Sequence, residues 1–145
     1  MKALVQRVSS ARVVVDAREV SAIGPGLLVL LGVADGDGPE QADRLADKVR
    51  ALRVFEDADG KMNEALGERE VLCVSQFTLL ADTTRQKGTR PDFSGAAPKE
   101  QAEPLYERFC QTLRDLGVPV STGVFGARMA VELVNDGPVT LLLEA

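Results

Sequence analysis

One continuous apolar run, residues 27–33, constrains the fold of this 145-residue chain more than any other feature. It reads Leu-Leu-Val-Leu-Leu-Gly-Val and follows the turn-forming segment 24–26, Gly-Pro-Gly. A half-exposed strand alternates apolar and polar residues, whereas a strand that is covered on both faces is apolar throughout. Residues 71–80, which begin Val-Leu-Cys-Val, are predicted as another buried strand. The chain must therefore place other elements on both sides of a β-sheet.

Two helical patterns can cover such a sheet. The first begins near Pro39, a residue that the first turn of a helix tolerates, and the second lies between Pro98 and Gly117. The first pattern has apolar residues at helical spacing, namely Ala42, Leu45, Val49 and Leu52. Short β-branched segments at both ends of the chain add further strands. The fold class that we predict is α/β, a single layered domain over residues 1–145 with β-sheets covered by two main helices, in β/β/α layers.

The chain contains no histidine, which excludes Ser-His-Asp and Cys-His nucleophiles and HExxH metal sites. Its two cysteines, Cys73 and Cys110, lie in apolar patterns typical of small core residues. We therefore predict no metal site and no cofactor. The apolar runs are far shorter than the roughly 20 residues that cross a bilayer, and the first residues read as a strand rather than a signal peptide. The expected location is the cytoplasm, without a membrane partner.

The formal net charge of −5 argues against indiscriminate binding to nucleic acid. Residues 83–99 nevertheless contain four basic residues and one acidic residue, and they overlap the longest irregular polar segment, residues 82–91. Arg85, Lys87 and Arg90 are our candidates for contacts with nucleic-acid phosphates. The alternative is a solvated surface loop.

Two short motifs contain the residues best suited to chemistry. Ser75-Gln76-Phe77-Thr78-Leu79 places three polar side chains in the apolar strand, where each needs a hydrogen-bond partner. These side chains form a site or, alternatively, face solvent and cap the nearby backbone. Residues 135–140, Asn-Asp-Gly-Pro-Val-Thr, either form a plain β-hairpin turn or present the Gly-Pro backbone in a fixed pose. Residues 123–129 form a pocket wall or part of the core.

With these two motifs the sequence resembles the D-aminoacyl-tRNA deacylases of the small bacterial and eukaryotic type. The similarity extends over essentially the whole chain and includes Gln6-Arg7-Val8, Arg90-Pro91-Asp92-Phe93 and Gly123-Val124-Phe125-Gly126-Ala127. One departure is the segment 83–89, which is slightly longer than the usual stretch before Arg-Pro.

The resemblance implies an enzyme that hydrolyses the ester of D-aminoacyl-tRNA, and also glycyl-tRNA, in chiral proofreading of translation. It implies a homodimer with active sites at the interface, where a cis Gly137-Pro138 element enters the partner's pocket. An L side chain would then clash with this backbone, and a D side chain would point into open space.

The resemblance also implies roles for single residues. Phe77 and Thr78 stabilise the oxyanion, Ser75 and Gln76 shape the pocket, and the ribose 2′-hydroxyl of the tRNA assists hydrolysis. Thr78 as a nucleophile is the alternative. The residues implied in substrate binding are Gly137, Pro138, Asn135, Met129 and Arg7, of which Arg7 holds the Gly-Pro element.

Two other functions remain open at this point. One is a broad hydrolase of small esters in which Ser75 or Thr78 is the nucleophile and Lys87 the base. The other is a non-catalytic RNA-binding module built on the basic loop.

Overall fold

The long strand β1 (Lys2–Val15) is central to the sheet in the computed structural model, which describes residues 1–84 and 88–145. It pairs with β2, β3 and β8, and the sheet continues from β3 through β6 to β7. The β3–β6 and β6–β7 pairs are parallel and the others antiparallel. The remaining elements are β2 (Arg18–Ile23), β3 (Gly26–Gly32), α1 (Pro39–Ala51), β4 (Phe55–Glu56), β5 (Met62–Glu64), β6 (Glu70–Ser75), the 3₁₀ helix η1 (Phe77–Leu80), α2 (Lys99–Asp115), β7 (Val120–Thr122) and β8 (Ala130–Glu144).

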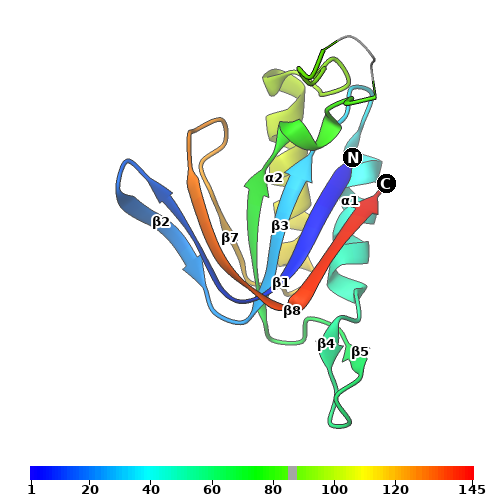
Figure 1. The fold of residues 1–145 in the computed structure, drawn as a ribbon. Helices are drawn as coiled ribbons and strands as arrows, with labels where there is room; N and C mark the ends of the chain where they lie inside the picture. Colours follow the sequence, from blue (N-terminus) through cyan, green and yellow to red (C-terminus); the bar gives the residue numbers. More distant parts are fainter. Residues whose placement is uncertain (85–87) are drawn as a thin grey trace.

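Both α-helices lie behind the same face of the curved sheet, and the small β4–β5 hairpin projects from one end (Figure 1). The two ends of the chain lie side by side, since the amino group of Met1 donates a hydrogen bond of 3.0 Å to the carbonyl of Ala145. The predicted fold class, an α/β domain with two covering helices, is confirmed.

The core occupies both faces of the sheet, as the apolar run predicted. Leu27 and Leu31 of β3 face the helices and share a buried cluster with Phe109 of α2. Leu28 of β3 and Leu72 of β6 belong to a second buried cluster that includes residues of β1 and β2. A fully buried Leu or Phe side chain contributes about 1.5–3 kcal/mol, so β3 anchors both layers.

The strand expected over residues 71–80 is wrong in its second half. The ladder ends where the Gln76 backbone N–H donates to the carbonyl of Leu31 at 2.8 Å. Leu79 then donates to the Gln76 carbonyl at 3.3 Å, and residues 77–80 form η1. The polar residues of this segment thus lie at the turn from a strand into a helix, where their side chains reach solvent and the cavity described below.

The plain hairpin turn at residues 135–140 is also wrong. β8 passes through this segment as one strand, while its register with β1 shifts between Gln6 and Ser10. The Gly137–Pro138 peptide bond is cis and lies between Asn135 and Thr140, where the register of β8 with β1 shifts and the strand bends (Figure 1). This segment therefore matches the second interpretation, a backbone held in a defined pose.

Candidate active site

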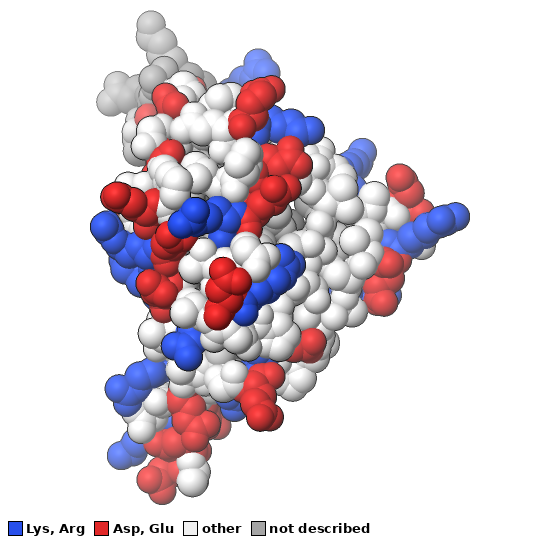
Figure 2. Space-filling model, turned by 180° about the vertical axis from the view of Figure 1, so that it is seen from behind, with Lys and Arg blue, Asp and Glu red and all other residues white. Residues whose placement is uncertain are grey.

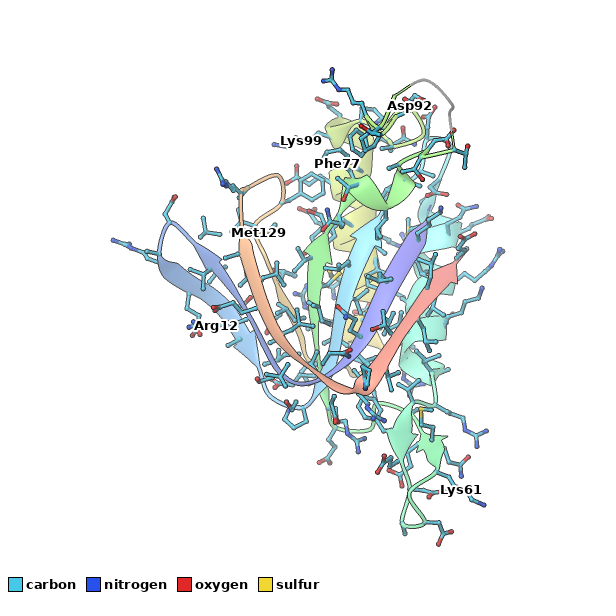
Figure 3. All side chains as sticks on the ribbon, viewed as in Figure 1. Arg12, Lys61, Phe77, Asp92, Lys99 and Met129 are labelled. Carbon is cyan, nitrogen blue, oxygen red and sulfur yellow. The ribbon has the colours of Figure 1, made fainter. Side chains whose placement is uncertain are left out.

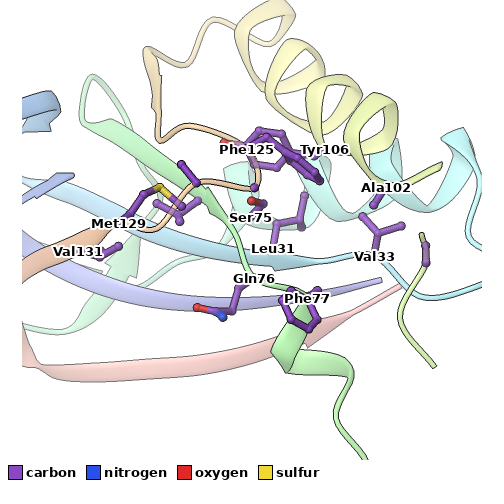
Figure 4. A pocket seen from close by; sticks show the side chains of 14 residues that line it. Leu31, Val33, Ser75, Gln76, Phe77, Ala102, Tyr106, Phe125, Met129 and Val131 are labelled. Carbon is purple, nitrogen blue, oxygen red and sulfur yellow. The ribbon is translucent and has the colours of Figure 1, made fainter. Parts of the chain in front are cut away.

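A cavity of about 270 Å³ lies where β3 and β6 end, beside the start of α2. Its walls come from five parts of the chain and are mostly apolar. They consist of Leu31, Val33, Val74, Ser75, Gln76, Phe77, Ala97, Ala102, Tyr106, Phe125, Gly126, Ala127, Met129 and Val131. Figure 4 shows Tyr106 and Phe125 together on the helix side, with Gln76 and Phe77 on the opposite side. The cavity thus has an aromatic wall and a polar wall, and residues 75–77 of the first motif supply the polar wall.

The polar wall forms because β6 ends against β3. Ser75 is the last residue of β6 and is half-buried, whereas Phe77 and Thr78 of η1 are exposed. The side-chain amide of Gln76 donates a hydrogen bond to the hydroxyl of Thr78. Among the described residues, no basic side chain contacts this hydroxyl. Thr78 is therefore oriented by an amide, which cannot act as a general base.

The aromatic wall is fixed from inside the protein. The hydroxyl of Tyr106 donates to the carbonyl of Cys73 at 2.7 Å, and the Tyr106 ring lies 5.6 Å from that of Phe125. Burial raises the pKa of the Tyr106 hydroxyl, so this group stays protonated and keeps its hydrogen bond. Burial also raises the pKa of the Cys73 thiol, and both cysteines are free and buried. Cys73 is therefore a neutral core residue behind the cavity.

A second cluster surrounds the cis peptide at the bend of β8. The guanidinium of Arg7, 7% exposed, donates to the carbonyls of Val54 at 2.7 Å and Asp136 at 3.0 Å. The side-chain amide of Asn135 donates to the carbonyls of Arg7 at 2.9 Å and Val139 at 3.0 Å. These bonds tie the segment on either side of Gly137–Pro138 to β1 and to the chain before β4.

Space at Gly137 is limited as well, because a Cβ atom there would lie 2.8 Å from Nη2 of Arg7. The φ angle of +128° also disfavours a side chain at this position. Gly137 and Pro138 themselves are exposed. The structure therefore holds this dipeptide firmly and leaves its outer surface open.

The structure brings some of the predicted site residues together and separates others. Ser75, Gln76, Phe77 and Met129 line the cavity, and Thr78 contacts Gln76 beside it. The second cluster, around Gly137–Pro138, lies elsewhere. Arg7 of this cluster pairs with Leu27 of β3, whereas the cavity is lined by Leu31 of the same strand. Four residues of strand separate Leu27 from Leu31, a distance of about 13 Å. These two groups do not meet within one chain. The separated residues are Arg7, Asn135, Gly137 and Pro138.

The predicted RNA contacts are only partly described. Arg90 is exposed and lies between Asp82 and Asp92, which pair through their backbones. Arg85 and Lys87 lie outside the described residues, and Lys87 as a catalytic base stays a prediction. In the described ranges, no group of three metal-binding side chains gathers, and no helix has the length and hydropathy to cross a bilayer.

Sequence reasoning missed the residues that α2 and its approach contribute to the cavity. Ala102 and Tyr106 belong to the apolar stripe of α2, and Ala97 lies just before this helix. A stripe that covers a sheet gives no sign that one end of it is open. The one signal was Tyr106, since the hydroxyl of a tyrosine in an otherwise apolar stripe needs a partner.

Comparison with known proteins identifies the family. The profile of the family described as D-Tyr-tRNA(Tyr) deacylase matches residues 4–144. A D-aminoacyl-tRNA deacylase of Anaeromyxobacter dehalogenans is 60% identical, with 100% of this chain and 97% of the relative covered. One of Symbiobacterium thermophilum is 56% identical, with 100% and 96% covered.

Two solved structures are similar to this chain over nearly its whole length. A structure described as "c-Myc DNA Unwinding Element Binding Protein" has a TM-score of 0.92 and 45% identity, with 100% of this chain and 99% of that chain covered. A second, described as "Structural Analysis of a probable eukaryotic D-amino acid tRNA deacylase", has a TM-score of 0.82 at 20% identity and 99% and 98% coverage, and shows the same fold. The profile and the full-length identity carry one conclusion: the chain belongs to the D-Tyr-tRNA(Tyr) deacylase family.

Proposed function

We propose that the chain hydrolyses the ester bond between a D-amino acid and the 3′-terminal adenosine of tRNA, and so acts in chiral proofreading of translation. Family membership makes the chain an enzyme, a D-aminoacyl-tRNA deacylase. The observation that carries the site assignment is the cavity at residues 75–77. It combines an aromatic wall, suited to a nucleobase or an amino-acid side chain, with a polar wall suited to the ester.

Hydrolysis of an ester needs an activated water and donors for the oxyanion that develops on the carbonyl. We assign the donor role to the backbone N–H groups of Phe77 and Thr78, which belong to the polar wall and its continuation. Ser75 and Gln76 shape this wall. The 2′-hydroxyl of the terminal ribose assists hydrolysis. We do not assign this role to Thr78, because its hydroxyl contacts an amide rather than a base.

Chirality is tested, in this proposal, by the Gly137–Pro138 backbone of a second subunit. Three observations support it: the dipeptide is exposed, it is held in place by Arg7, and it lies away from the cavity of its own chain. A rigid backbone close to the substrate α-carbon rejects an L side chain by steric overlap. Glycine has no side chain to reject, so glycyl-tRNA is a second substrate.

A homodimer would bring the two clusters together. Among the described residues, β8 pairs with β1 alone, so its other edge has no strand partner there. It also exposes apolar side chains, and a contiguous apolar patch marks a site of protein interaction. The exposed ones are Leu133, Val134, Leu141 and Leu142.

Contact with tRNA is assigned to the loop between Asp82 and Asp92 rather than to the helices. Over the described residues, the helix face carries acidic and basic side chains in alternation, with no extended basic surface (Figure 2). The loop carries Arg90, two residues before Asp92, and Asp92 lies at the same end of the molecule as Phe77 and Lys99 (Figure 3). Basic residues at this end would meet the phosphates that precede the terminal adenosine. Arg85 and Lys87 complete the proposed set.

The direct test charges tRNA with D-tyrosine and with L-tyrosine and follows the loss of each ester over time. The proposal expects the D ester to be hydrolysed and the L ester to persist at the uncatalysed rate. Equal loss of both enantiomers contradicts the chiral assignment, and no loss of either contradicts the enzyme assignment. Esters without a 2′-hydroxyl serve as the control, because a general esterase would hydrolyse them and this mechanism does not.

A further inference from the structure

An aromatic pair lies at the mouth of the cavity. The ring of Phe93 contacts that of Phe77 edge to face, with centroids 5.2 Å apart and planes at 69°. The two side chains are 38% and 57% exposed, unusually open for phenylalanine. Phe77 lines the cavity and belongs to the motif at residues 75–79, whereas Phe93 comes from the segment after the basic loop. Because both rings are exposed, the pair adds little stability through burial of apolar surface. Its main effect is to fix the position of the two rings.

Phe93 is placed by its main chain. On one side, the backbones of Asp92 and Asp82 exchange hydrogen bonds of 3.1 and 2.8 Å and close the loop. On the other side, Ala96 donates to the carbonyl of Phe93 at 3.0 Å, and Ala97 donates to that of Val33 at 2.9 Å. Both flanks are therefore bonded to fixed parts of the fold, and Phe93 can act as a support.

The ring of Phe77 is less constrained than the backbone that carries it. The Gln76 backbone donates to the Leu31 carbonyl, which fixes the chain just before η1. The Phe77 ring itself extends towards solvent, and in the described residues Phe93 is its only aromatic contact. Without Phe93 the ring would be free to change rotamer, and the short helix at Phe77 and Thr78 could shift with it.

We propose that Phe93 is a positioning residue for the deacylation reaction. Its ring holds Phe77 in place, and thereby keeps the backbone N–H groups of Phe77 and Thr78 aligned with the ester. This inference rests on the proposed function and adds to it a residue from outside the cavity. Because the oxyanion develops only in the transition state, the loss of alignment lowers kcat more than it raises KM.

The test compares Phe93→Leu, which keeps an apolar side chain without a ring, with Phe93→Tyr, which keeps the ring. Steady-state hydrolysis of D-tyrosyl-tRNA gives kcat and KM for each variant. We expect Phe93→Leu to lower kcat about three- to tenfold, the range expected for one aromatic pair, with KM changed less than about twofold. Phe93→Tyr retains the wild-type kcat. Val20→Ala, on β2, is the control for truncation of an exposed apolar side chain.

A double-mutant cycle with Phe77→Leu decides whether Phe93 acts through Phe77, since backbone N–H groups survive both substitutions. The inference expects Phe93→Leu to have no further effect on kcat in the Phe77→Leu background. The same loss of kcat in both backgrounds overturns it, as does a wild-type kcat for Phe93→Leu. Thermal melting of each variant identifies a loss of folded protein. An inactive wild-type enzyme would instead contradict the proposed function.

Discussion

Gly32, the last residue of β3, determines how closely the segment from Gln76 to the end of η1 approaches the sheet. A Cβ atom at this position would lie 2.5 Å from Cδ2 of Leu80 and 2.9 Å from the carbonyl oxygen of Gln76. Leu80 ends η1, and Gln76 precedes it. The absence of a side chain at one residue therefore permits the turn from β6 into η1 that forms the polar wall.

Gly32→Ala should reduce activity strongly. The added methyl group must displace the Gln76 carbonyl, and overpacking of this kind costs about 1–3 kcal/mol of stability. We expect kcat for D-aminoacyl-tRNA to fall more than about tenfold, because small displacements of oxyanion donors cost on this scale. Gly24→Ala is the matched control, since its Cβ would find its closest atom, Oε2 of Glu70, at 3.9 Å. A fully active Gly32→Ala enzyme would show that the position of Gln76 does not matter.

Thr78→Val, which keeps the volume of threonine and removes its hydroxyl, separates the two mechanisms for the chemical step. Loss of a true nucleophile typically lowers kcat by a factor on the order of 10⁴ or more. Thr78 contacts an amide, so we expect a loss of less than about tenfold, which reflects a less ordered Gln76. Single-turnover deacylation of D-tyrosyl-tRNA measures it. Trapping of a covalent aminoacyl-enzyme on the wild-type chain would contradict the RNA-assisted route.

Between elements, the clearest electrostatic contact joins the two helices. Arg108 of α2 donates to both carboxylate oxygens of Asp43 of α1, at 2.9 and 2.8 Å, and Thr112 adds a bond of 2.8 Å. The hydrogen bond from Arg108 is the main cause that lowers the pKa of Asp43 from its usual 3.8, followed by that from Thr112. Because both charged side chains are largely exposed, solvent screens the pair and its contribution to stability is small.

Asp43→Asn tests this contact through its pH dependence. A carboxyl whose pKa is lower in the folded state stabilises the fold above its unfolded pKa, and the contribution disappears as the pH falls through the folded pKa. The variant should therefore melt below the wild type at pH 7, and the difference should shrink as the pH falls below 3.8. Circular dichroism melts at several pH values measure it. A difference that is constant with pH would assign the effect to packing instead of charge.

The elements differ in how far sequence could predict them. The helices and the buried strand β3 were predictable because periodicity and an unbroken apolar run directly encode which faces are covered. The end of β6 at Ser75 could not be predicted, because the apolar pattern continues through Phe77, Leu79 and Leu80 and a 3₁₀ turn satisfies it equally well. The path of β8 through Asn135 and Pro138 depended on side-chain bonds from Arg7, far away in sequence. Sequence reasoning found the motif residues of the cavity from their polarity, but it did not find the wall that α2 contributes.

At the scale of the whole molecule, the two motif clusters occupy separate places in one chain. In the proposed homodimer, a second molecule would bring the Gly137–Pro138 backbone of one chain to the cavity of the other, in a two-fold pair with two equivalent sites. The exposed apolar side chains of β8 lie on the same strand as this dipeptide. Dimer formation and catalysis should therefore depend on the same surface.

Leu142→Arg tests that dependence. Leu142 is 51% exposed on β8, so the charge disturbs no core contact of the single chain, but in a dimer it would be buried without a partner. We expect a folded monomer of 15.5 kDa by light scattering, with deacylase activity reduced to background. Ala51→Arg, at the exposed end of α1, adds the same charge on the helix layer and should leave both mass and activity unchanged. A Leu142→Arg monomer that retains full activity and full rejection of L-aminoacyl-tRNA would show that each chain forms its site alone, since no partner backbone would then be available to test the substrate.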